Sequence, residues 1–309
     1  MEEQSGQSVL RDDVIDVLKG FAIFCVVLGH IHPVKPVLNF IYSFHMALFM
    51  FLSGITFWFS FERKRAQGLM DRKKVCLYII KRCASLILPF AVWCEIKGIV
   101  LENQLDFLKN VRCNFGYYWF LPTLFGIIVF ATVPNLFRKP ENAKNDFLFD
   151  MVVLFISALL CAVCFKYTQI KVFRQILIYL PFFYFGLFVK KYAFIGRIFS
   201  SHVAIGVSIL AYLFVFQFYS IDDMSRLSLA ARFVTGLLFT VIIYNFVKTY
   251  HDEMHFGIRN CISNFGKHSL QIYLIQEFFR SSVPSASLKQ RFLHSRTLFP
   301  ISRSALKFT

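Results

Sequence analysis

The stretch LKGFAIFCVVLGHIHP, residues 18–33, decides the class of this protein. It is almost wholly apolar, but Lys19 opens it and His30 stands near its end. The run has about the length of the roughly 20-residue helix that crosses a bilayer. An ionisable group at membrane depth costs free energy unless it is paired or faces water, so the two residues indicate a functional site.

Similar apolar runs recur along the 309 residues, of which 57% are hydrophobic and 17% charged. A soluble domain usually approaches a quarter charged residues, so this composition excludes that class. We predict an all-α fold, a multi-pass transmembrane helical bundle of about nine to ten spans. The nine runs that we count are residues 14–32, 37–61, 76–100, 115–133, 147–165, 173–189, 202–219, 228–247 and 262–279.

The net charge of +16 is concentrated in loops. The segment ERKRAQGLMDRKK, residues 62–74, holds six basic residues against two acidic ones. Basic loops stay in the cytoplasm, so we expect a cytoplasmic N-terminus and a cell (plasma) membrane location. The charge then serves orientation and contact with membrane lipids, and we expect no nucleic-acid partner.

Two patterns resemble metal sites without matching one. Cys161 and Cys164 have CxxC spacing, but they lie in an apolar run with no second pair. His251 and His255 lie one helical turn apart, but the order HDEMH is not HExxH. A structural zinc site takes four ligands, so we expect no metal and no bound cofactor.

Lys19 and His30 share one face of the first predicted helix. Eleven residues sweep three turns plus about 20°, over about 16 Å. Asp16 lies one turn before Lys19 on the same stripe. Lys19 alone could snorkel to the membrane surface, which is the alternative explanation.

His45 lies in the second span, about eight residues below the surface that His30 also approaches. The short connection makes the two helices neighbours. Imidazole loses its proton near neutral pH, so the pair suits general-base chemistry on an alcohol. The alternative for His45 is a buried residue that serves packing only.

Two further groups are candidates for substrate binding. Lys81 and Arg82 lie about one to two turns into the third span and could bind a phosphorylated ligand together with Lys19. Positive-inside anchoring explains the two residues nearly as well. Trp119, within YYWFLP, could stack on a carbohydrate or belong to an aromatic belt at the membrane interface.

At these residues the sequence resembles the acyltransferase 3 family of integral membrane O-acyltransferases, in its subset of fucose 4-O-acetylases and polysaccharide O-acetyltransferases. The resemblance covers about residues 11–279. The matching stretches, in family order, are IDVLKGFAIFCVVLGH (15–30), YSFHMALFMFLSG (42–54), KRCASLILPF (81–90), WFLPTLF (119–125) and GKHSLQIYLI (266–275).

The resemblance implies transfer of an acyl group, usually acetyl from acetyl-CoA, to a hydroxyl. The implied acceptor is a cell-surface glycan or its lipid-linked precursor, and acyl-CoA is the donor substrate. The family's basic-x10-histidine pattern falls on Lys19 and His30. Two positions depart from the family pattern: Ala47 replaces a proline near His45, and Gln276 replaces a frequent histidine, which puts a role for that position in doubt.

The expected mechanism combines the residues with the resemblance. Acyl-CoA places its phosphates near Lys19, Lys81 and Arg82. His30 acts as general base on the acceptor hydroxyl or briefly carries the acyl group, and His45 shares the proton or polarises the thioester carbonyl. The acceptor lies near Trp119, and Asp16 pairs with a cation. The alternative function is a transporter or exporter of a glycan or small solute.

We assign residues 11–279 to a membrane acyltransferase domain and residues 280–309 to an atypical basic tail. The tail contains no apolar run of spanning length. Family members typically have ten spans. Either the span count is off by one, or unrelated sequence replaces the last helix, as a frameshift would do.

Overall fold

The computed structural model describes residues 13–31, 34–66, 72–136 and 143–282. This part of the chain contains helices and no strand, which confirms the all-α prediction. The tail after residue 282 lies outside the described residues. The helices are α1 (Asp13–His30), α2 (Lys35–Ala66), α3 (Arg72–Glu102), α4 (Phe107–Tyr118), α5 (Phe120–Thr132), the 3₁₀ helix η1 (Val133–Leu136), α6 (Ala143–Thr168), α7 (Lys171–Lys191), α8 (Ala193–Phe199), α9 (His202–Phe216), α10 (Arg226–Tyr250), α11 (Phe256–Lys267) and α12 (Ser269–Ser282).

Five of the described helices are long and apolar enough to cross a membrane. The number rises to seven if each of two bent pairs counts as one span: α4 with α5, bent by 85°, and α8 with α9, bent by 57°. This is fewer than the nine spans predicted above. Helix α1 is missing from the set and carries three charged residues. The predicted span 262–279 is divided at His268 into the short helices α11 and α12.

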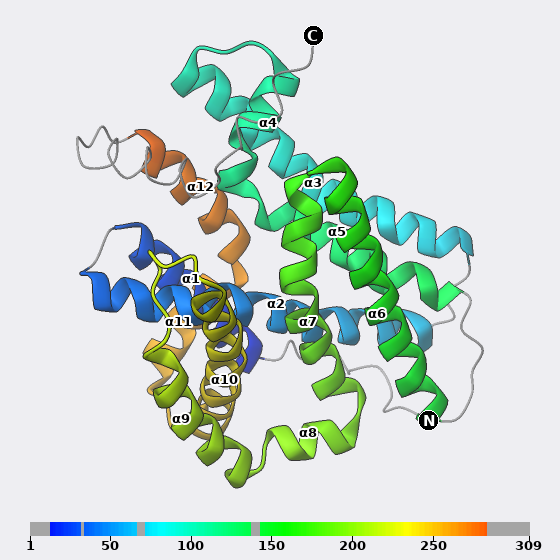
Figure 1. Ribbon diagram of the computed structural model, residues 1–309, viewed down its shortest axis with the longest axis vertical. Helices are drawn as coiled ribbons and strands as arrows, with labels where there is room; N and C mark the ends of the chain where they lie inside the picture. The colour runs from blue at the N-terminus through cyan, green and yellow to red at the C-terminus, as the bar shows by residue number, and fades with distance from the viewer. Residues whose placement is uncertain (1–12, 32–33, 67–71, 137–142, 283–309) are drawn as a thin grey trace, which may run out of the picture.

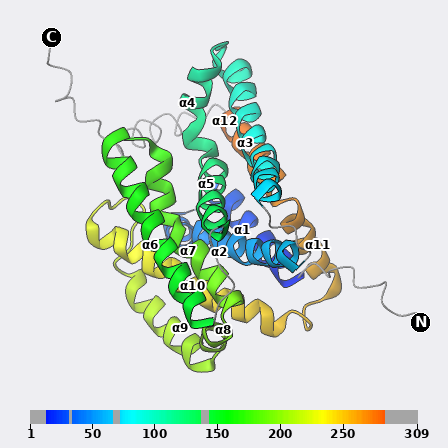
Figure 2. The same cartoon turned by 90° about the vertical axis from the view of Figure 1, so that its right-hand side faces the viewer.

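Helix α2 organises the bundle. It crosses the middle of the molecule and packs against α1, α7 and α10 (Figure 1). In the turned view, α6, α7, α9 and α10 lie toward the left, while α3, α11 and α12 lie toward the right (Figure 2). Because α2 touches both sets, the residues on its successive faces hold the two halves together.

Glycines allow two helix pairs to meet backbone to backbone. A Cβ on Gly54 of α2 would lie 1.9 Å from the carbonyl oxygen of Phe183 in α7. Where α1 crosses α11, a Cβ on Gly266 would lie 1.8 Å from the carbonyl oxygen of Asp16. The hydrophobic effect does not drive helices together in lipid. Small residues let the two backbones approach closely, so that van der Waals contacts hold the pair together. The second crossing holds α1 at Asp16, one helical turn before Lys19.

The first residue of α1 is held by polar contacts. Ser263 of α11 donates a hydrogen bond of 2.5 Å to Asp13. His251 lies with Nε2 3.1 Å from the same carboxylate and with Nδ1 2.9 Å from Asp252. His255 instead caps α11, because its ring accepts from the backbone N–H of Gly257. The two histidines of HDEMH thus have separate structural partners.

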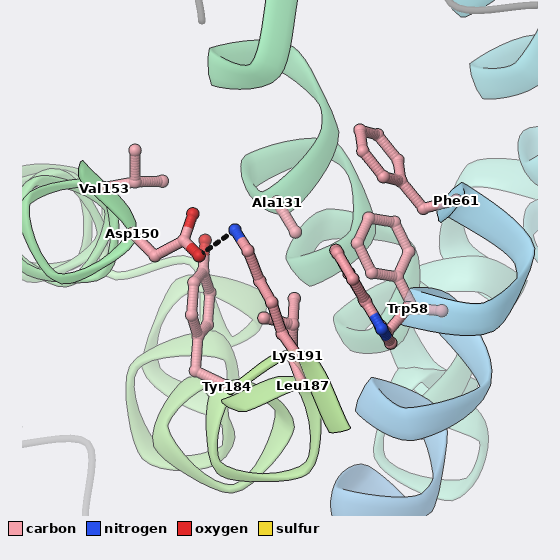
Figure 3. A pocket seen from close by; sticks show the side chains of 9 residues that line it. Trp58, Phe61, Ala131, Asp150, Val153, Tyr184, Leu187 and Lys191 are labelled. Atoms are coloured by element: carbon pink, nitrogen blue, oxygen red, sulfur yellow. Dashed lines mark hydrogen bonds and ion pairs between the residues drawn. The ribbon is translucent and has the colours of Figure 1, made fainter. Parts of the chain in front are cut away.

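A buried ion pair joins α6 to α7. Asp150 binds the ammonium of Lys191, and the hydroxyl of Tyr192 donates to the same carboxylate at 2.5 Å. The Lys191 and Asp150 side chains are only 6% and 8% exposed. Figure 3 shows the pair between α6 and α7, with Trp58 and Phe61 of α2 beside it. The pair is a structural link between two long helices.

Candidate active site

A cavity of about 150 Å³ runs along α1. Lys19, Ile23 and Val26, at helical spacing, form its α1 wall. The middle of the predicted stripe, from Lys19 to Val26, therefore faces one cavity. The other lining residues are Met46, Phe49, Ser53, Leu86, Phe120, Leu124, Ser269, Leu270 and Tyr273.

His30 lies one turn beyond the Val26 wall and contacts α12. Its Nδ1 is 2.8 Å from Oε1 of Gln276, and its Nε2 is 3.2 Å from Oε1 of Glu277. The Glu277 side chain is 4% exposed and that of His30 is 17% exposed. On α12, Tyr273 lines the cavity one turn before these two residues. The histidine thus stands where the cavity-lining faces of α1 and α12 continue.

The contacts of His30 offer its ring two hydrogen-bond acceptors. Oε1 of Gln276 and Oε1 of Glu277 both accept, so the ring can donate from Nδ1, from Nε2 or, as imidazolium, from both. If Nε2 takes up a proton, Glu277 is placed to accept a hydrogen bond from it and to stabilise the imidazolium. This is the arrangement of a general base supported by a carboxylate.

His45 is buried in α2, and its backbone contact sets its tautomer. Its Nδ1 lies 2.8 Å from the carbonyl oxygen of Ile41, so this nitrogen donates and Nε2 keeps the lone pair. The ring of Tyr42 meets it edge-on, with 4.9 Å between the ring centres. Gly29 of α1 packs against Tyr42, because a Cβ on Gly29 would lie 3.0 Å from the ring of Tyr42. The two histidine helices are neighbours, as predicted.

Cations follow one face of α2 below the cavity. Lys19 donates to Thr56 at 3.2 Å, and Arg82 donates to Ser60, one turn further along α2, at 3.4 Å. Lys64, another turn along, lies 3.8 Å from the ring centre of Tyr78. Tyr78 also accepts a hydrogen bond of 3.1 Å from Arg82. Lys19 and Arg82 thus bind α2 one helical turn apart, and Lys64 extends the row.

The remaining predicted residues have different surroundings. Lys81 is exposed beside this row. Asp16 is buried, 2% exposed, at the crossing of α1 and α11, and its pairing with a cation stays a prediction. Trp119 stands at the break between α4 and α5 and stacks on Tyr179 of α7, with 5.0 Å between ring centres.

A comparison with known protein families identifies the family of this chain. The profile of the family described as "Acyltransferase domain", Acyl_transf_3, matches residues 12–283, nearly the whole chain. The chain belongs to the acyltransferase 3 family. Its long apolar helices are those expected of a membrane protein in this family.

Two curated relatives resemble part of this chain. The nodulation protein NolL of Sinorhizobium fredii (strain NBRC 101917 / NGR234) is 30% identical over 133 residues, covering 36% of this chain and 33% of the relative. NolL of Mesorhizobium japonicum (strain LMG 29417 / CECT 9101 / MAFF 303099) is 27% identical over 148 residues, 42% of this chain and 37% of the relative. The matched segments span little more than a third of either relative. No solved structure matches the chain.

The sequence analysis missed Glu277 and Arg232. Both are ionisable residues within predicted spans, so the rule that singled out Lys19 applies to them too. It also left the role of Gln276 in doubt, because histidine is frequent there in the family. The structure places Gln276 and Glu277 against His30. Only the contact between α1 and α12 identifies them as its partners, and sequence spacing does not contain that contact.

Proposed function

We propose that this acyltransferase transfers an acetyl group from acetyl-CoA to a hydroxyl of a cell-surface glycan or of its lipid-linked precursor. One observation carries the proposal. His30, with a carboxylate and an amide beside its two nitrogens, lies one helical turn beyond a cavity that Lys19 lines. A thioester donor can lie along the cavity while a hydroxyl reaches the histidine from the other side.

The donor end consists of the cations along α2. Lys19, Arg82 and Lys64 offer ammonium and guanidinium groups, which bind phosphate through charge-assisted hydrogen bonds. The exposed Lys81 adds positive charge nearby. The phosphates of CoA bind here, and the pantetheine arm runs along the apolar cavity toward His30. Lys19 and His30 are about 16 Å apart along the helix, a span suited to an extended arm.

The chemical step uses the neutral imidazole of His30 as the base. It removes the proton of the acceptor hydroxyl as the oxygen attacks the thioester carbon, and Glu277 stabilises the resulting imidazolium. The bond to sulfur then breaks, and CoA leaves as the thiol after taking up that proton. His45 already donates its Nδ1 proton to Ile41, so the neutral ring is suited to share a proton rather than to polarise the carbonyl.

The membrane location follows the charge of the loops. The basic segment 62–74 favours a cytoplasmic position for the end of the bundle that holds Lys19. Acetyl-CoA would then enter from the cytoplasm, and the acceptor would approach from the opposite side of the plasma membrane. The family assignment favours this enzyme over the transporter that we considered from the sequence.

The test measures transfer of labelled acetyl groups by the protein in lipid nanodiscs. His30→Ala is expected to lower glycan acetylation by about 10²-fold or more, since general-base catalysis contributes that much. His45→Ala is expected to lower it less. His202→Ala, at an exposed position of α9, is the matched control and should keep full activity. Full acetylation by both the His30 and His45 variants would contradict the mechanism.

A further inference from the structure

Arg232 of α10 is a half-buried cation that the mechanism does not use. Within the described residues, its guanidinium makes no ion pair and no side-chain hydrogen bond. The helix containing it is long and apolar enough to span the membrane. A charge within a membrane span is normally paired or faces water. The fold retains this arginine without an acidic partner from the described part of the chain.

Three tyrosines lie close enough to interact with this arginine: Tyr42 of α2, Tyr179 of α7 and Tyr219, which precedes α10. Ser220, next to Tyr219, hydrogen-bonds to Ser228, one turn before the arginine on α10. Tyr219 is 6% exposed, and its hydroxyl oxygen is buried without a hydrogen-bond partner among the described residues. Phenol groups are hydrogen-bond donors and are uncharged near neutral pH. The cluster therefore presents a cation and an unused donor, and the tyrosines supply no negative charge.

The cluster adjoins the two histidines. His45 lies close enough to Arg232 and to His30 for electrostatic interaction. The packing of α10 on α2 accounts for this placement, because Gly236, one turn after Arg232, would touch Ala47 with a Cβ 2.9 Å away. Tyr179 also stacks on Trp119, the aromatic residue predicted to contact the acceptor. Arg232 thus lies next to the reacting end and away from the row of donor-binding cations.

We propose that Arg232 and Tyr219 form a subsite for an oxyanion of the acceptor, a carboxylate or a phosphate carried by the sugar. A guanidinium binds either group through two parallel hydrogen bonds, and a tyrosine hydroxyl can add a third. The negative charge that develops in the transition state would balance the charge of Arg232 only during the reaction. A negative group of the acceptor balances that charge for as long as the acceptor is bound. The proposal rests on the function proposed above and narrows its acceptor to acidic or phosphorylated sugars.

Binding is measured without donor, by ligand-detected NMR on the protein in nanodiscs. The probes are methyl β-glucuronide, glucose 1-phosphate and neutral methyl β-glucoside. We expect at least one charged sugar to bind about tenfold or more tightly than the neutral one, as charge-assisted hydrogen bonds predict. Preference for the glucuronide indicates an acidic glycan, and preference for the phosphate indicates a sugar-phosphate precursor. Equal binding of all three sugars overturns the proposal.

Variants assign the preference to the cluster. Arg232→Gln should remove the advantage of the charged sugar, and Arg232→Lys should keep part of it. Tyr219→Phe should weaken the charged sugar but not the neutral one. If Arg232→Gln does not fold, the Arg232→Lys and Tyr219→Phe results decide the question. An undiminished advantage in the folded variants overturns the proposal.

His30→Ala separates this proposal from the proposed function. The variant should bind the charged sugar as the unmodified protein does, yet fail to acetylate it when acetyl-CoA is added. If the unmodified protein binds the charged sugar but acetylates none of the probes, the proposed function is contradicted and the oxyanion subsite stands. If acetylation occurs with no preference for charge, the subsite is refuted and the proposed function stands.

Discussion

At the scale of single residues, the contacts of His30 with α12 give the candidate site its chemistry. Gln276 lies beside Nδ1, and Glu277 lies beside Nε2. A base in this setting has a carboxylate ready for the positive charge that develops on the ring. The substitution of a frequent family histidine by Gln276 therefore preserves a partner for the ring.

Replacing Glu277 by glutamine tests the carboxylate with little change in shape. Glu277→Gln removes the negative charge that stabilises the imidazolium, so we expect the turnover number for acetyl transfer to fall by about 10²-fold. The KM for acetyl-CoA should stay nearly constant, because the cations that bind phosphate lie at the other end of the cavity. Initial rates at varied donor concentration separate the two constants.

Glu253→Gln, at an exposed position outside the site, is the matched control and should leave both constants unchanged. A Glu277→Gln enzyme with an unchanged turnover number would show that the carboxylate does not support His30. A raised KM alone would place Glu277 in donor binding instead.

Sequence reasoning identified His30, His45, Lys19 and Arg82 because each is an ionisable residue in an apolar run. The same reasoning overlooked Glu277 and Arg232. Their roles depend on helices that are far apart in the chain, and neither spacing nor composition shows that α12 and α10 meet α1 and α2. A rule applied evenly to every charge in a span would have named both residues without assigning their partners.

At the scale of helices, the glycine crossings should be among the least tolerant positions. Gly54→Ala would push a methyl group against the backbone of α7, so the helices must separate. We expect a loss of about 1–3 kcal/mol in unfolding free energy, as for other overpacked sites. Thermal unfolding in detergent, followed by circular dichroism, measures the change.

Gly206→Ala in α9 is the matched control, because a Cβ at Gly206 has no heavy atom within 4 Å. Alanine favours helices over glycine by up to about 1 kcal/mol, so this variant should be neutral or slightly stabilised. Equal unfolding midpoints for the two variants would show that α2 and α7 do not meet at Gly54.

The Asp150–Lys191 link gives a second prediction at this scale. Asp150→Asn leaves the buried ammonium of Lys191 without its counter-charge, so we expect a loss of about 3–5 kcal/mol. The double variant Asp150→Leu, Lys191→Met removes both charges and should lose much less. Denaturant unfolding of the three proteins measures the difference. A double variant as unstable as the single one would show that the ion pair itself stabilises the bundle.

Helix boundaries were only partly predictable. Hydropathy located most spans because lipid requires long apolar helices. It did not show the 85° bend between α4 and α5, or the break at His268 that separates α11 from α12. The polar groups of short helices with charged residues are satisfied by contacts with neighbouring helices. A hydropathy window runs along the sequence and does not include those contacts. The sequence predicted one continuous span in each region for this reason.

At the scale of the whole molecule, the two ends of the bundle should face different compartments. In a variant without the eight cysteines, Asp222→Cys and Lys73→Cys mark the two ends, since Asp222 is 62% exposed and Lys73 is also exposed. Basic loops remain cytoplasmic, so a membrane-impermeant maleimide should label only Asp222→Cys in intact cells. Lys73→Cys should become reactive after the membrane is permeabilised. Labelling of Lys73→Cys but not of Asp222→Cys in intact cells would show that the orientation is the opposite one.

The class of the molecule was the most predictable property. A composition with few charges and recurrent apolar runs leaves little choice besides a membrane bundle, and five motifs in family order pointed to an acyltransferase. The arrangement of helices around α2 was not predictable, because it depends on glycine contacts and buried polar links between distant segments. The candidate site combines the two kinds of information: its α1 half was visible in the sequence, and its α12 half was not.

Lys19 and His30 belong to one continuous helix, and this sets the length scale of the reaction. Their separation depends on the pitch of α1 and is independent of the thickness of the surrounding bilayer. A thinner or thicker membrane can tilt α1 without stretching it, so the donor arm keeps the same reach in every lipid. One residue inserted between them would turn the end of α1 by about 100° and carry the imidazole away from α12. In the proposed mechanism, α1 thus fixes the distance between the donor-binding lysine and the histidine that meets the acceptor.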